Sequence, residues 1–62
     1  QSAHEGEEFI MVMSGMVEIT YGKNTYVLNE GDTIYYDSIV PHHVHSYQGQ
    51  AARILAVIYT PI

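Results

Sequence analysis

The absence of cysteine from a chain of only 62 residues leaves few ways to stabilise a fold. A domain of this size buries only about 60% of the surface that its unfolded chain exposes, so its hydrophobic core is marginal. Disulfides and thiolate metal sites are excluded because no thiol is present. A metal site built from histidine and carboxylate ligands, or a partner chain, is the remaining route to stability. We therefore expect residues 1–62 to form a single domain that needs a metal ion or a partner chain to be stable.

The charge of the chain argues against nucleic acid as a direct partner. Two Lys and Arg residues are set against seven Asp and Glu residues, which gives a net charge of −5. Binding to phosphates or to an anionic membrane surface needs a basic patch that this composition cannot supply. No segment approaches the roughly 18 consecutive apolar residues of a spanning helix. We expect no contact with nucleic acid or membranes and a cytoplasmic location, which the lack of cysteine also permits.

Glycine and asparagine divide the chain into short segments rich in Val, Ile, Tyr and Thr, a pattern typical of an all-β fold. The last segment contains alanines that a helix could use, but its second half is β-branched and aromatic, so we interpret it as a strand. Six strands in so short a chain leave edges that a closed barrel or a partner must cover. The expected strands are 7–13, 16–21, 25–28, 33–36, 42–47 and 52–60, with a hairpin between the second and the third.

Strand alternation predicts which polar side chains point inward. Glu8 has the same parity as Ile10, so its carboxylate is expected at the inward end of an apolar row. His42 shares a face with Val44, whereas the two other histidines of that strand point to the opposite face. A buried, isolated carboxylate is costly. Glu8 is therefore expected to have a partner inside the fold, and His42 is the histidine expected in a pocket.

A shared divalent metal would provide that partner. In an extended chain His4 and Glu8 would lie about 13 Å apart, too far to share a metal whose ligand bonds are about 2.1 Å long. Gly6 permits a tight bend that brings the two side chains together. With His42 they form a set of two histidines and one carboxylate, which suits Fe, Zn, Mn, Ni or Co. Alternatively, the acidic segment is a solvated turn and His42 a hydrogen-bonded loop histidine.

Two further groups of side chains have simpler interpretations. Phe9, Met11 and Met13 form an apolar stripe on the opposite face of their strand, where we expect a dimer or sheet contact rather than a cofactor site. The six tyrosines lie in or beside expected strands and are mostly packing or interface residues. Tyr36, just before the loop that leads to His42, is the tyrosine expected to donate a hydrogen bond into a pocket.

Two sequence motifs resemble those of the cupin superfamily. His4, three residues, Glu8, six residues and Gly15 match the end of the first cupin motif. The sequence in and around these motifs is most similar to cupin domains attached to helix-turn-helix transcriptional regulators. It is also similar to hydroxypropylphosphonic acid epoxidase, an iron enzyme. The frame of the second cupin motif is matched by Gly31, residues 37–39 and His42.

The resemblance implies a small jelly-roll barrel with a metal or ligand pocket inside. Ser2 stands where the first histidine of the cupin motif would fall, so three metal ligands are implied, namely His4, Glu8 and His42. The coordination position that the missing histidine leaves open has room for substrate or oxygen. Ser2 and Tyr36 are the candidate pocket residues. Strands that usually precede the first motif are missing, which suggests a fragment, a minimal cupin, or a barrel completed by its partner.

Two functions agree with these expectations. The first is a small metal-binding cupin domain that holds or senses a small polar molecule, as the ligand-binding part of a larger regulator. The second is a mononuclear non-haem metal enzyme of the oxygenase or isomerase type. No further general acid or base can be identified in the sequence, which favours the first. We expect a homodimer in either case.

Overall fold

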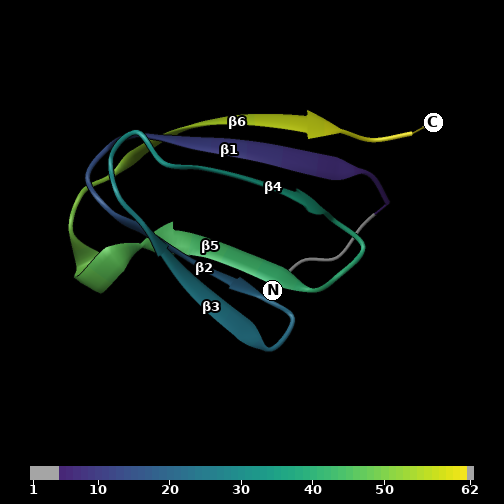
Figure 1. Cartoon of the computed structure of the whole chain (residues 1–62), viewed down its shortest axis with the longest axis horizontal. Coiled ribbons are helices and arrows are strands. Elements are labelled where there is room, and N and C mark those ends of the chain that lie inside the picture. The colour runs from purple at the N-terminus through teal and green to yellow at the C-terminus, as the bar shows by residue number, and fades with distance from the viewer. Residues whose placement is uncertain (1–4, 62) are drawn as a thin grey trace.

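Six β-strands account for most of the computed structural model, which describes residues 5–61 (Figure 1). The strands are β1 (Glu7–Ser14), β2 (Val17–Tyr21), β3 (Asn24–Leu28), β4 (Thr33–Asp37), β5 (His42–Ser46) and β6 (Arg53–Tyr59). The all-β expectation is confirmed, and no strand end differs from its expected position by more than one residue. Within residues 5–61 the one helical segment is a 3-10 turn, and no helix is long and apolar enough to cross a membrane.

The strands form two antiparallel sheets of three, with the orders β4-β1-β6 and β3-β2-β5. The predicted hairpin is the β2–β3 pair. In Figure 1 the two sheets lie one above the other, and the chain crosses between them at both ends. No ladder joins one sheet to the other among the described strands, so each sheet keeps two edges there. The architecture is compatible with a small jelly roll.

The core lies between the sheets and follows the predicted alternation. Glu8 is 7% exposed and His42 is 5% exposed, so the inward orientation expected for both is confirmed. His43 and His45 on β5 are exposed, as expected for the opposite face. The buried hydrophobic residues are Ile10, Val12, Val17, Ile19 and Tyr36.

The register of the strands within each sheet brings the polar side chains of the core to one end of it. On the first sheet Glu8 of β1 pairs with Tyr36 of β4. On the second sheet Tyr21 of β2 pairs with His42 of β5. The loop between β4 and β5 is short and passes from one sheet to the other at this end, so it also contributes to the site.

Gly6 has the positive φ that the predicted bend requires, at +124°. A Cβ at this position would collide with the carbonyl oxygen of Tyr59 at the end of β6. Gly31 also has a positive φ, +88°, but an added Cβ there would meet open space. An alanine at position 31 would therefore add only backbone strain, which costs about 1–3 kcal/mol. An alanine at position 6 would add a steric clash to such strain.

We expect Gly6→Ala to destabilise the domain by more than Gly31→Ala does. Gly31→Ala should cost about 1–3 kcal/mol, because only the backbone conformation becomes unfavourable. Gly6→Ala must in addition move β6 away from the start of β1. Urea unfolding followed by circular dichroism measures both values. Equal losses for the two variants would contradict this account of Gly6.

Candidate functional site

Glu8 and His42 face each other between the two sheets. His42 Nε2 lies 2.8 Å from Glu8 Oε1. On the other side of the ring, His42 Nδ1 lies 2.8 Å from the carbonyl oxygen of Val40. A carbonyl oxygen only accepts hydrogen bonds, so Nδ1 must carry a proton and donate it. Nε2 is the ring nitrogen that is directed at the carboxylate.

This arrangement requires a positive charge or a proton between Nε2 and Oε1. In a neutral imidazole with its proton on Nδ1, Nε2 presents a lone pair, and a carboxylate oxygen also presents lone pairs. Two acceptors at 2.8 Å repel each other unless a proton or a metal ion lies between them. Two atoms bound at right angles to one ion at about 2.1 Å are about 3.0 Å apart. The observed spacing therefore fits either occupant with little movement.

Two hydroxyl groups hold the carboxylate from other directions. The Tyr36 hydroxyl donates to Glu8 Oε2 at 3.1 Å, and Ser38 Oγ donates to Glu8 Oε1 at 3.1 Å. Ser38 is completely buried. Burial, reinforced by the nearby Glu8 carboxylate, raises the pKa of the Tyr36 phenol well above its usual value. The phenol is therefore protonated at neutral pH and acts as a donor. We call Glu8, Tyr36, Ser38 and His42 the carboxylate cluster.

The loop after β4 has a defined structure that presents Ser38 to the cluster. The Ile39 amide donates to Asp37 Oδ1 at 3.0 Å, an Asx-type turn. The Ser38 amide donates to the carbonyl oxygen of Gly6 at 2.9 Å. The Tyr21 hydroxyl donates to the carbonyl oxygen of Asp37 at 2.9 Å, which ties the loop to the second sheet. Bonds to both sheets thus hold the Ser38 side chain in place.

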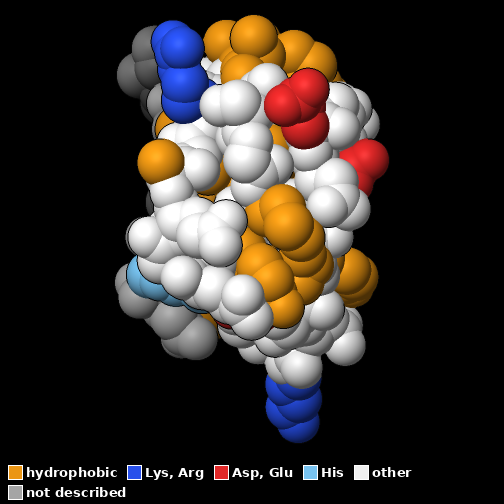
Figure 2. All heavy atoms as spheres, turned by 90° about the vertical axis from the view of Figure 1, so that its left-hand side faces the viewer, with side chains coloured by type: hydrophobic (Ala, Val, Ile, Leu, Met, Phe, Trp, Pro, Cys, Tyr) orange, Lys and Arg blue, Asp and Glu red, His pale blue; other side chains and the backbone are white. Residues whose placement is uncertain are grey.

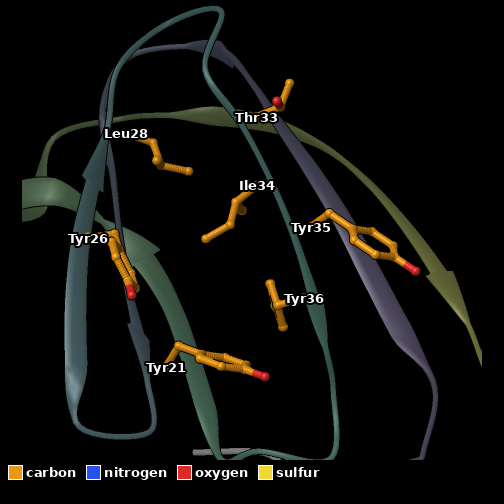
Figure 3. Close-up of a pocket in the computed structure, with 7 residues that line it drawn as sticks. All are labelled: Tyr21, Tyr26, Leu28, Thr33, Ile34, Tyr35 and Tyr36. Carbon is orange, nitrogen blue, oxygen red and sulfur yellow. The ribbon is translucent and has the colours of Figure 1, made fainter.

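A pocket of about 440 Å³ opens beside the carboxylate cluster, between β3 and β4. Figure 3 shows Tyr26 and Leu28 of β3 facing Ile34 of β4 across it. The Tyr36 ring lines the pocket and packs against the His42 ring, with 5.2 Å between the centroids. Tyr36 therefore connects the pocket, which its ring lines, to Glu8, which its hydroxyl contacts.

The structure brings together three of the five residues named from the sequence: Glu8, His42 and Tyr36. His4 and Ser2 lie outside the described residues, so their roles stay predictions. Within residues 5–61 no group of three or more His, Cys, Asp or Glu side chains could hold a metal ion.

Ser38 is the member of the cluster that sequence reasoning did not single out. It lies in a loop, and strand alternation makes no prediction outside a strand. Its position two residues after Tyr36 was the available signal, because alternation continued past the end of β4 points both side chains the same way.

The other histidines of β5 form a separate contact on the exposed face. His45 Nε2 lies 2.8 Å from Glu18 Oε1 on the neighbouring strand, and both side chains are partly open to solvent. The His43 and His45 rings lie 4.9 Å apart between centroids. These residues point away from the carboxylate cluster, so substitution of His45 or Glu18 is a matched control for substitutions within it.

Comparison with known proteins identifies the family. A family model described as the cupin domain matches residues 1–58. No curated protein and no solved structure matches the chain. The similarity to regulator domains and to the epoxidase therefore stays a prediction. The match spans almost the whole sequence and agrees with the observed two-sheet fold. This chain belongs to the cupin family.

Proposed function

We propose that this chain is a metal-binding cupin domain that holds a small polar molecule. The observation that carries the proposal is the contact between His42 Nε2 and Glu8 Oε1 at 2.8 Å, with Nδ1 already bound to a carbonyl oxygen. Such a pair suits a cation between its two acceptor atoms. Cupin domains often bind metal ions, so a metal is the occupant that we propose.

Glu8 and His42 would hold the ion, with His4 as the proposed third ligand. One carboxylate and two imidazoles suit Fe, Zn, Mn or Ni. When bound, the ion supplies a Lewis acid that attracts an oxygen atom of the ligand. The Val40 carbonyl fixes the orientation of the His42 ring and makes Nε2 a better donor of its lone pair. Hydrogen bonds of this supporting kind typically change metal affinity about 10- to 100-fold.

The pocket supports the second half of the proposal. Tyrosines and a threonine, whose side chains carry hydroxyl groups, line it together with Leu28 and Ile34, so it suits a small ligand that has a polar end and a flat or apolar part. The polar end of such a ligand would point along Tyr36 toward Glu8. Within the described residues no observation favours catalysis over binding, so binding is the function that we propose.

Titration of the metal-free chain with Zn²⁺, Ni²⁺ and anaerobic Fe²⁺ tests the proposal. We expect one ion per chain, measured by isothermal titration calorimetry and by elemental analysis after gel filtration. His45→Ala, which removes an exposed histidine, should bind the same amount. A chain that retains no ion after gel filtration, or a site lost in His45→Ala, would contradict the proposed metal function.

A further inference from the structure

The two oxygens of the Glu8 carboxylate have different neighbours. Oε1 lies 2.8 Å from His42 Nε2 and accepts a hydrogen bond from Ser38 Oγ at 3.1 Å. Oε2 accepts a hydrogen bond from the Tyr36 hydroxyl at 3.1 Å. The oxygen that faces the histidine is therefore not the oxygen that Tyr36 holds. An ion between Oε1 and Nε2, the proposed function on which this inference rests, would meet only one of the two carboxylate oxygens.

Packing on two sides holds the Tyr36 hydroxyl at Oε2. Tyr36 lies directly opposite Glu8 in the ladder between β4 and β1, where facing Cβ atoms are about 4.5–5.5 Å apart. The Tyr36 ring packs against the rings of His42 and Tyr21, with 5.2 Å between the centroids in each case. Figure 3 shows the Tyr21 ring beside Tyr36 at the end of the pocket. The phenol is only 6% exposed, so it cannot turn away from the carboxylate without disturbing both rings.

The two hydroxyl groups that orient Glu8 are neutral. The chain has only two Lys and Arg residues, and in Figure 2 their side chains lie at opposite ends of the face shown. Both residues are exposed, whereas Glu8 is buried between the sheets. Hydrogen bonds from Tyr36 and Ser38 therefore fix the direction of the carboxylate and leave its negative charge available to an ion.

We propose that Tyr36 is a positioning residue that sets the metal preference of this site, because its hydroxyl keeps Glu8 bound to the ion through Oε1 alone. Carboxylates bind metal ions through one oxygen or through both. Binding through both would draw Oε2 to the ion and leave the buried phenol without its acceptor, which is costly. With one carboxylate oxygen the imidazole ligands dominate, which favours Zn, Fe or Ni. A second carboxylate oxygen would favour Mn.

Ser38 has a different effect on the same carboxylate. Its hydroxyl donates to Oε1, the oxygen that faces His42, so removing it leaves the bond between Tyr36 and Oε2 in place. Loss of the Ser38 hydroxyl should weaken every metal ion to a similar degree, since the number of ligand oxygens does not change. The two hydroxyls are therefore expected to separate affinity, which both support, from metal preference, which only Tyr36 sets.

Tyr36→Phe tests the proposal because it keeps the ring and removes only the hydroxyl. Titration of the metal-free chain with Mn²⁺ and with Zn²⁺ gives two dissociation constants, and we expect their ratio, Mn²⁺ to Zn²⁺, to fall about tenfold or more. Tyr21→Phe is the matched control, since Tyr21 packs against Tyr36 but its hydroxyl donates to the carbonyl oxygen of Asp37. The ratio should stay at the wild-type value in Tyr21→Phe and in Ser38→Ala.

The visible spectrum of the Co²⁺-loaded chain gives a second readout, which a loss of stability alone does not move. The bands of Co²⁺ weaken as the number of its ligands rises, so they should be weaker in Tyr36→Phe than in the wild type or in Tyr21→Phe. If the ratio and the spectrum are unchanged in Tyr36→Phe, or change equally in Tyr21→Phe, the role of Tyr36 is wrong although the metal site stands. A wild-type chain that binds none of these ions would overturn the proposed function and this inference together.

Discussion

Glu8→Gln is expected to abolish stoichiometric metal binding while the fold remains intact. The amide has the shape of the carboxylate but no charge. Its NH₂ group can donate to His42 Nε2, which keeps its lone pair because Nδ1 donates to Val40. Its oxygen can still accept from the Tyr36 hydroxyl. An N–H hydrogen of the amide thus lies where the shared proton lay, and the site no longer has a carboxylate charge to hold a metal ion.

The loss of metal affinity in Glu8→Gln should be larger than about 10- to 100-fold, which is the usual loss when a residue that only hydrogen-bonds to a metal ligand is removed. Calorimetric titration with Zn²⁺, together with elemental analysis after gel filtration, measures it. Glu18→Gln is the matched control, since Glu18 also lies 2.8 Å from a histidine, but on the exposed face. Retention of one ion by Glu8→Gln, or an equal loss in Glu18→Gln, would show that the carboxylate cluster is not the metal site.

Alternation was enough to predict two members of the carboxylate cluster from the sequence. Glu8 and His42 are both in strands, and a strand whose apolar residues share one parity has only one inward face. The position of Tyr36 just before the loop to His42 likewise identified it as a donor, and its hydroxyl does contact Glu8. The predictions for Glu8 and His42 depend only on local periodicity, and that for Tyr36 depends only on its position in the sequence.

The remaining features depend on contacts that periodicity does not contain. Ser38 joins the cluster because the loop after β4 is bonded to Gly6 and to Tyr21. The exposure of β6 depends on which strands lie next to it, and the alternation of residues along one strand does not predict its neighbours in the sheet. Phe9 and Met11 of the predicted apolar stripe are half-buried between β4 and β6, whereas Met13 is 52% exposed. A dimer through that stripe stays a prediction.

The carboxylate cluster also has a structural consequence that is independent of any metal. Glu8 is buried, and in the absence of a metal ion its 2.8 Å contact with His42 Nε2 requires a proton between the two atoms. Breaking a buried ion pair by removing one partner costs about 3–5 kcal/mol, because the other charge stays in a medium of low polarity. The total stability of a domain is typically only about 5–15 kcal/mol, and a short chain is expected near the lower end. We therefore expect the pair of Glu8 and His42 to contribute a large share of the stability of the metal-free domain.

His42→Ala should accordingly lower the free energy of unfolding of the metal-free chain by about 3–5 kcal/mol. The double variant Glu8→Gln with His42→Ala should recover much of the loss, because no charge then remains buried without its histidine partner. The four chains of this cycle are compared by urea unfolding monitored by circular dichroism, which gives the coupling energy of the pair. We expect a coupling of about 2 kcal/mol or more. Additive losses, or a His42→Ala chain as stable as the wild type, would mean that Glu8 and His42 are not coupled in the folded domain.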